Sequence, residues 1–261
     1  MNRNCIIVAA ISATALLQTP QAIAQGLSSE VEGVIGLGVG SAPTFAGSDE
    51  TETEVLPIID LEWRRFFLNS ELGVGGYVLR RDDDIAEYGV ALSLGYDFES
   101  REQDDDARLS GLDDVEGTAT LNAIFEYGLG PADLEFVISR GIGGDGHGGT
   151  TATLSAGFDT MLGERLQVGV APFVRWADGD YTDAFYGVSA SEAGRSSFSR
   201  YDASSGIERY GLELSGYYRL TERVGIAAEV EWGRLSGDAA DSPLVFDDTQ
   251  IEVGIGLLYN F

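Results

Sequence analysis

The histidine and its neighbours are the first candidate for chemistry. His147 is the only histidine in the chain and lies in the segment Gly143–Gly149, two residues after Asp145. An imidazole near a carboxylate could act as a general base, which a serine nucleophile of a hydrolase would need within hydrogen-bond reach. However, six glycines occur within residues 141–149, and so free a backbone does not position a base. The pattern favours a flexible loop, and no catalytic residue is predicted.

Two further patterns could bind ligands. The acidic runs Asp82–Asp84, Asp104–Asp106 and Asp113–Asp114 could offer oxygen ligands to Ca²⁺, but none has EF-hand spacing, and charge runs usually form solvated loops. The glycine patterns at 36–40 and 73–76 lie in segments that read as strands, without a following helix to hold a phosphate. We therefore expect no metal site and no cofactor.

Composition excludes several classes of protein. The chain has 43 acidic residues against 16 basic ones, all arginine, and a formal net charge of −27. This charge opposes nucleic-acid binding, which needs basic patches, and favours solubility in salt. The one cysteine, Cys5, lies in an N-terminal segment that reads as removable. Disulfides, thiolate metal sites and a cysteine nucleophile are therefore not expected.

The N-terminus resembles an export signal. Arg3 supplies a positive charge, residues 6–17 form an apolar core, and Ala22–Ala24 forms a small-x-small cleavage site. An apolar core of about 12 residues is shorter than the ~20 that a spanning helix requires. We expect residues 1–24 to be a cleaved signal peptide and residues 25–261 to be one exported domain.

The elements that would position any site are strands. Apolar side chains alternate with small or polar ones in segments of about ten residues, the period of a strand with two different faces. The clearest is Gln250–Phe261, in which Ile251, Val253, Ile255, Leu257 and Tyr259 share one face and only Leu258 interrupts the other. The strong segments are 87–98, 120–127, 151–159, 166–176, 209–219, 223–232 and 250–261, and the weaker ones are 31–40, 54–62, 66–79 and 132–142.

This alternation fits either a soluble sandwich or a barrel in lipid with a polar lumen. Aromatic residues crowd the strand ends, as membrane-interface girdles require. The polar face carries both signs of charge, which could pair across a narrow lumen: Arg175, Arg209, Glu213, Arg219, Glu229, Glu231 and Glu252. These features favour an all-β, closed antiparallel transmembrane barrel.

The connections support this architecture. Short turns at 128–132, 162–164 and 220–222 alternate with long connections at 99–116, 141–149, 177–205 and 236–249, a pattern typical of periplasmic turns and extracellular loops. Eleven segments are found, but a closed single-chain barrel needs an even number. We expect twelve strands, either by splitting 66–79 or by adding a short strand near 181–188, with ten as the alternative.

Loop and strand motifs along nearly the whole chain resemble the MipA/OmpV family of outer-membrane proteins. The motifs are Gly36–Gly40, Pro43, Phe45, Gly47–Asp49, Leu56-Pro57, Tyr181, Phe185–Val188, Ala193, Ser196, Tyr201, Gly206 and Gly237–Val245. The resemblance implies a Gram-negative outer-membrane barrel in contact with lipid and lipopolysaccharide. The family's namesake is a scaffold that holds a lytic transglycosylase to a murein synthase, whereas other members are antigens linked to permeability or adhesion. The family offers no catalytic residue to carry over.

Three functions stay open from the sequence. The favoured one is a non-enzymatic scaffold or interaction protein in the maintenance of the cell envelope and its murein. The alternative is a small pore, although Phe173, Tyr217 and paired arginines and glutamates would fill much of a narrow lumen. The third is an outer-membrane hydrolase that uses His147.

Overall fold

The chain folds into one closed β-barrel. The computed structural model describes residues 31–82, 86–144 and 146–261, so the predicted signal segment 1–24 lies outside the described residues. Twelve strands follow one another around the wall, each antiparallel to its neighbours, and β1 pairs with β12 to close the sheet. Closure pairs most backbone groups within the wall, as a membrane-spanning sheet requires.

The strands of the wall are β1 (Glu32–Pro43), β2 (Thr51–Trp63), β3 (Phe66–Asn69), β4 (Gly73–Asp82), β5 (Glu87–Asp97), β6 (Thr118–Leu129), β7 (Ala132–Gly141), β8 (Thr150–Leu162), β9 (Leu166–Ala177), β10 (Gly206–Arg219), β11 (Val224–Leu235) and β12 (Thr249–Asn260). The helices are η3 (Ala107–Leu109), α1 (Gly179–Tyr186), α2 (Ala190–Ala193) and α3 (Gly237–Ala240). None of the helices in the described part of the chain is long and apolar enough to cross a membrane.

The barrel fold and the count of twelve strands are confirmed. Splitting the segment 66–79 was the right choice, because the chain reverses after Asn69 and β3 and β4 form a hairpin. The alternative strand near 181–188 is wrong. Asp178 accepts a hydrogen bond from the Tyr181 N–H at 3.0 Å and caps helix α1 there. A capping carboxylate satisfies a backbone donor that a strand would have paired in a ladder.

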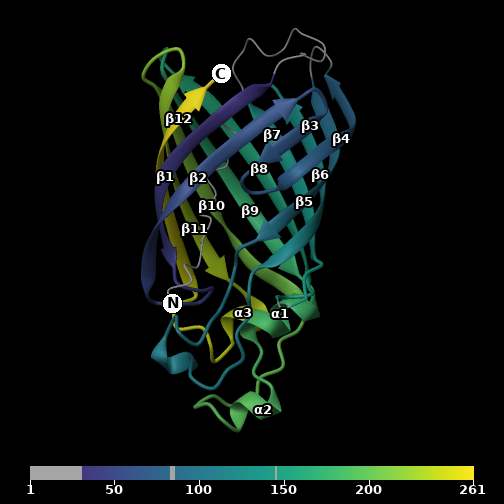
Figure 1. Cartoon of the computed structure of the whole chain (residues 1–261), viewed down its shortest axis with the longest axis vertical. Coiled ribbons are helices and arrows are strands. Elements are labelled where there is room, and N and C mark those ends of the chain that lie inside the picture. Colours follow the sequence, from purple (N-terminus) through teal and green to yellow (C-terminus); the bar gives the residue numbers. More distant parts are fainter. Residues whose placement is uncertain (1–30, 83–85, 145) are drawn as a thin grey trace.

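Two different ends result from the unequal connections (Figure 1). The turn end carries the short turns 64–65, 130–131, 163–165 and 220–223 together with the C-terminus. The loop end carries all three α-helices and the long connections 98–117, 142–149, 178–205 and 236–248. These two names are used for the ends below.

The outward face of the wall is apolar, and strand β12 illustrates why. Ile251, Val253, Ile255 and Leu257 are exposed, whereas Leu258 is 1% exposed and points inward. Leu258 interrupts the polar alternation because it packs in a lumenal cluster with Val34, Ile58 and Ala227. Aromatic side chains are exposed near both rims, among them Tyr127, Trp176, Tyr210, Tyr218, Trp232 and Tyr259. The wall therefore has the outward band and aromatic residues of a lipid-facing barrel.

Candidate functional site

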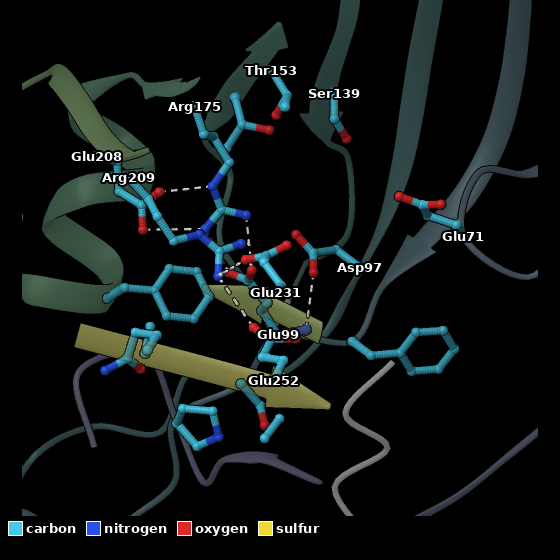
Figure 2. Close-up of a pocket in the computed structure, with 18 of the residues that line it drawn as sticks. Glu71, Asp97, Glu99, Ser139, Thr153, Arg175, Glu208, Arg209, Glu231 and Glu252 are labelled. Atoms are coloured by element: carbon cyan, nitrogen blue, oxygen red, sulfur yellow. Dashed lines mark hydrogen bonds and ion pairs between the residues drawn. The ribbon is translucent and has the colours of Figure 1, made fainter. Parts of the chain in front are cut away.

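A cavity of about 290 Å³ lies in the lumen, in the half of the barrel nearer the loop end. Charged side chains line one part of it: Arg175 on β9, Arg209 on β10, Glu231 on β11 and Glu252 on β12 (Figure 2). All four occupy inward positions on four consecutive strands of the wall. The carboxylates of Glu71, Asp97, Glu99, Glu208 and Glu229 also line the cavity. Neutral hydrogen-bonding side chains line the neighbouring part of the wall: Thr120, Asn122, Ser139, Thr151 and Thr153.

Arg175 is the centre of the first ionic group. Its Nε lies 2.7 Å from Glu208 Oε2, and its Nη1 lies 2.8 Å from Glu99 Oε1. The Tyr186 hydroxyl donates to Glu208 Oε1 at 2.5 Å, and the Tyr181 hydroxyl donates to Glu99. The group thus joins two wall strands to the chain that follows β5 and to helix α1, which lie at the loop end.

The charge states of the loop groups follow from these contacts. Burial alone would raise the pKa of Glu99, but the charges of Arg175 and Arg209 and the hydrogen bonds from Arg175 and Tyr181 outweigh it and hold this pKa well below its usual range. Burial raises the pKa of the Tyr181 and Tyr186 hydroxyls, which therefore stay protonated donors. The first ionic group therefore consists of the Arg175 guanidinium between the carboxylates of Glu99 and Glu208. Each carboxylate also accepts a hydrogen bond from a neutral tyrosine hydroxyl.

Arg209 forms the second ionic group. Its Nη1 lies 3.2 Å from Glu252 Oε1 and 3.4 Å from Glu231 Oε1, and its guanidinium lies 5.7 Å from the Phe173 ring. The predicted pairing of opposite charges inside the lumen therefore occurs for Arg209, Glu231 and Glu252, but it joins the neighbouring strands β10, β11 and β12 and does not cross the lumen. Arg219 is different, because it is exposed at the turn end and donates to the Glu164 carbonyl.

The loop end is covered by a cap, defined here as the described residues 44–50, 98–117, 142–144, 146–149, 178–205 and 236–248. Its core consists of two buried clusters whose main members are Tyr181, Phe185, Tyr186, Ala239, Phe45, Leu109, Leu112, Val188 and Leu244. Hydrogen bonds tie its segments together: the Asp113 N–H donates to Glu192 Oε1 at 2.9 Å, and Arg101 Nη2 donates to the Ala184 carbonyl at 3.2 Å. The long connections are packed structure over the lumen.

Apolar side chains also narrow the lumen nearer the turn end. Tyr217 packs against the cluster that contains Leu258, and its hydroxyl accepts a hydrogen bond from Asn260 Nδ2 at 2.9 Å. A second cluster places Phe67, Ala91 and Ile124 inside the barrel, with Tyr77 packed against it. The cavity therefore lies between the cap and two apolar clusters of the lumen.

With this geometry established, comparison with known proteins identifies the family. The model of the family described as MltA-interacting protein MipA matches residues 35–261. The chain belongs to the MipA family. The match runs from the fourth residue of β1 to the C-terminus and confirms the resemblance noted in the motifs.

Known proteins similar to this MipA-family barrel include one curated relative and two solved structures. YiaT of Escherichia coli (strain K12), which carries the name of an outer membrane protein, is 23% identical over 238 residues, covering 90% of this chain and 94% of YiaT. A solved bacterial polysaccharide outer membrane secretin is 10% identical, with 87% of this chain and 98% of that chain covered and a TM-score of 0.45. Outer membrane phospholipase A from Escherichia coli is 12% identical, with 95% and 96% covered and a TM-score of 0.37.

In this MipA-family protein, most of the family motifs lie in the cap. Phe45, Val188 and Leu244 share one of its buried clusters, and Tyr181 and Phe185 share the other. Backbone contacts use the same segments. The Gly47 carbonyl accepts from the N–H groups of Phe246 and Asp247 at 2.7 and 3.1 Å, and Ser242 Oγ donates to the Tyr186 carbonyl at 2.6 Å. The motifs therefore specify how the cap folds.

The interpretation of His147 as part of a flexible loop is wrong. Its side chain is buried, and its Nε2 lies 3.0 Å from Asp97 Oδ2. Its ring packs edge-on against Tyr181 at 4.8 Å and lies 5.5 Å from the Phe185 ring. The glycines do not loosen this segment, because close approaches to other backbone hold it: a Cβ at Gly149 would lie 2.3 Å from the Tyr181 backbone. Asp145, the predicted neighbouring acid, lies outside the described residues.

The acidic runs that the structure describes serve the cap's own hydrogen bonds. Asp106 caps η3 by accepting from the Arg108 N–H at 2.7 Å, and Asp105 accepts from the Glu102 N–H at 2.7 Å. Asp114 accepts from the Gln103 N–H at 2.8 Å, and Asp113 pairs with Arg195. Among the described residues no group of three histidine, cysteine or acidic side chains is arranged to hold a metal ion.

Sequence analysis missed three groups of the site: Glu99, Glu208 and Tyr181. Glu208 would face outward by simple alternation with Arg209, but the register of β9 and β10 shifts between Ile207 and Arg209. A bulge of this kind places two successive side chains on related sides of a strand, so both reach the lumen. Glu99 and Tyr181 come from long connections, and no strand period extends there to reveal them.

Proposed function

We propose that this MipA-family barrel is a non-enzymatic scaffold that holds murein-processing enzymes at the outer membrane. The observation that carries the proposal is the match of residues 35–261 to a family named for interaction with MltA. The partners would be a lytic transglycosylase and a murein synthase, brought together at one face of the barrel. The residues that the structure describes offer a rigid frame for such a role.

The proposal includes an orientation in the membrane. Short turns commonly lie on the periplasmic side of outer-membrane barrels, and long connections lie outside the cell. The turn end would then face the murein, and the acidic cap would face lipopolysaccharide. Removal of residues 1–24 as a signal peptide belongs to the same proposal, because an outer-membrane protein must first be exported.

A scaffold accounts for the geometry better than a pore. The cap and the lumenal clusters lie on opposite sides of the cavity, and an open channel would need a continuous aqueous path along the barrel axis. A hydrolase is also disfavoured. The described contacts of His147 are to Asp97, Tyr181 and Phe185, and none of them is the serine hydroxyl that the hydrolase hypothesis requires.

Exposed arginines are the candidate docking groups. The turn end carries Arg64, Arg65, Arg165, Arg219 and Arg223, although the chain as a whole is strongly acidic. Arg64 lies 5.0 Å from the Trp63 ring and Arg65 lies 5.4 Å from the Phe66 ring, which holds both guanidinium groups near the membrane surface. Such groups can pair with carboxylates of a partner protein.

The test is capture of partners from solubilised envelope with the intact barrel as bait, followed by mass spectrometry. We expect a lytic transglycosylase and a murein synthase, and we expect the double variant Arg64→Ser/Arg65→Ser to lose at least half of both. The matched control is Arg195→Ser/Arg200→Ser, which removes two exposed arginines of the cap. Capture that excludes murein enzymes, or equal loss with both double variants, would contradict the proposal.

Planar-bilayer recordings separate the scaffold from the pore. We expect no steady channel from the purified barrel, because the cap and the lumenal clusters occupy space along the axis. Steady open channels in the unaltered protein would favour the pore instead.

A further inference from the structure

The barrel wall is incomplete on one side. Strand β3 is only 4 residues long, and the hairpin to β4 turns at residues 70–72, well before the loop end. β2 therefore pairs with β3 only through Asp60–Trp63, and β5 pairs with β4 only from Glu87 to Leu94. Among the described residues no strand lies between residues 51–58 of β2 and residues 95–97 of β5. This interval of the wall is called the lateral opening below, and in Figure 1 β3 and β4 lie at the turn end only.

Side-chain hydrogen bonds stabilise the turn of the short β3–β4 hairpin. Asn69 Oδ1 accepts from the N–H groups of Glu71 and Leu72 at 2.7 and 3.0 Å, which closes the turn. Ser70 completes the ladder on β2, where its Oγ accepts from the Ile59 N–H at 2.8 Å and lies 3.2 Å from the Pro57 carbonyl oxygen. These side chains replace strand partners where the pairing stops.

Position 57 of β2, beyond the end of the pairing with β3, is also informative. Ile59 directs its N–H toward Ser70, and backbone groups two residues apart point the same way, so position 57 would direct an N–H into the opening. Pro57 has no N–H to leave unpaired. The edge is thus adapted to having no strand neighbour.

The lateral opening reaches the apolar band of the membrane. Val55 is 68% exposed and lies opposite Val39, which is 47% exposed and in turn lies opposite Ile255, at 56%. On the β5 side, the rings of Tyr96 and Phe98 pack with centroids 4.7 Å apart. Unpaired backbone at this depth is tolerated where it borders a cavity that holds water or a ligand.

The lumenal cavity extends to this opening. Its lining includes Ser70 and Leu72 of the turn and the outward-facing Tyr96, as well as Ser139 and Thr153 deep in the lumen. In Figure 2, Glu71 lies on the side of the cavity opposite the arginines. The cavity therefore extends from the polar lumen to the lateral opening.

The lining selects the kind of molecule that could enter. Carboxylates outnumber guanidinium groups, which disfavours a phosphate, and the main carboxylates are already paired with Arg175 or Arg209. Side-chain hydroxyls and paired charges can both donate and accept hydrogen bonds, as sugar hydroxyls do. We propose that the lateral opening admits the uncharged sugar head group of a glycolipid from the loop-side leaflet into the cavity, while its alkyl chain stays in the membrane.

The experiment uses the full barrel in phosphatidylcholine vesicles and three photoreactive probes. The first is dodecyl maltoside with a diazirine on the sugar, the second is maltose with the same group, and the third is a dodecyl phosphate with a diazirine beside the phosphate. After irradiation, adducts are mapped by mass spectrometry. We expect dodecyl maltoside to label the peptides of Ser139 and Thr153 at least about tenfold more than maltose, because the membrane concentrates it at the opening.

Matched variants assign the route and the site. Val55→Trp should obstruct the opening and reduce lumenal labelling severalfold, whereas Val39→Trp, in the same outward row, should not. The double variant Ser139→Ala/Thr153→Val should also reduce it, whereas Ser155→Ala, which lies outside the cavity lining, should not. The heat-dependent shift in gel mobility checks that each variant forms a barrel.

Three outcomes would overturn the proposal. They are equal lumenal labelling by maltose, equal lumenal labelling by dodecyl phosphate, and adducts confined to outward positions such as Leu214 and Val230. Each can occur whether or not murein enzymes bind at the turn end, so the result is independent of the scaffold proposal.

Discussion

Replacing Arg175 with methionine is the sharpest test of how the cap is attached to the barrel. The change removes the partner of Glu208, whose side chain is 1% exposed and lies 2.7 Å from the guanidinium. It also removes the 2.8 Å contact with Glu99 in the cap. Methionine keeps much of the side-chain volume, so the main effect is a buried carboxylate left with only the Tyr186 hydroxyl as a donor.

The magnitude follows from the cost of an uncompensated buried charge. Breaking one partner of a buried ion pair typically costs about 3–5 kcal/mol, and each kcal/mol lowers the melting temperature by about 2–4 °C in a domain of this size. We therefore expect Arg175→Met to lower the melting temperature by roughly 6–20 °C, measured by calorimetry or by loss of the folded gel band. The cap should also become accessible to protease before the barrel unfolds.

Two further variants separate charge from packing. Arg175→Met/Glu208→Met removes both charges and should recover most of the lost stability, because apolar replacement of a whole buried pair is often neutral. Arg200→Met breaks an exposed pair with Asp202 and should cost less than about 1 kcal/mol. A loss below about 1 kcal/mol for Arg175→Met, or a double variant as unstable as the single one, would refute the reasoning.

Four more changes test other parts of the molecule. Gly47→Ala should cost about 1–3 kcal/mol and increase cleavage of the cap by protease in intact cells, because Gly47 has φ +95° and a Cβ there would lie 2.7 Å from Val245. His147→Ala should cost about 2–4 kcal/mol and leave esterase and peptidase assays at background; loss of a measurable hydrolysis would instead assign a base. Deletion of Phe261 should reduce membrane insertion, measured as the folded fraction in outer-membrane extracts, and normal insertion would contradict the role of the terminal aromatic residue. Because the folded-state pKa of Glu99 is lowered, its contribution to stability is present above the unfolded value of about 4.3 and is lost as pH falls through the folded-state pKa. The cap should therefore loosen only in strongly acidic solution, and Glu99→Gln should show less of this acid dependence in a protease assay.

The wall could be predicted from the sequence because a lipid-facing strand shows its environment at every second residue. The outward residues from Ile251 to Tyr259 on β12 follow that period along the whole strand, and the residues between them are polar or small except Leu258, which packs in the lumenal cluster. The strand count was harder, because β3 is too short to show a period of its own. In the sequence, the β3–β4 hairpin was indicated only by the length of the segment 66–79, which is longer than the other predicted strands.

The site could be predicted only in part, for a physical reason that differs from residue to residue. Arg209, Glu231 and Glu252 follow the strand alternation, so their inward position and the pairing of their charges were predictable, although they pair between neighbouring strands. Glu208 breaks the alternation at a bulge, and Glu99 reaches Arg175 from a long connection. His147 was misjudged because local glycine content says nothing of contacts made by residues far along the chain, such as Asp97 and Tyr181.

The cap restricts access to the lumen at the loop end, and the apolar clusters restrict it nearer the turn end. The lateral opening is therefore the more direct route for a ligand to the lumen. The cap is held by apolar clusters and by Arg175, so an opening along the axis would require many contacts to break together. The lateral opening requires none, because β2 ends its pairing with β3 at Asp60 and Ser70 already bonds to Ile59 at that point. Loosening the cap by Arg175→Met and obstructing the opening by Val55→Trp should therefore have separable effects. If the lumen is reached from the membrane, Val55→Trp alone should reduce labelling of Ser139, and Arg175→Met should mainly increase labelling by maltose from the aqueous side.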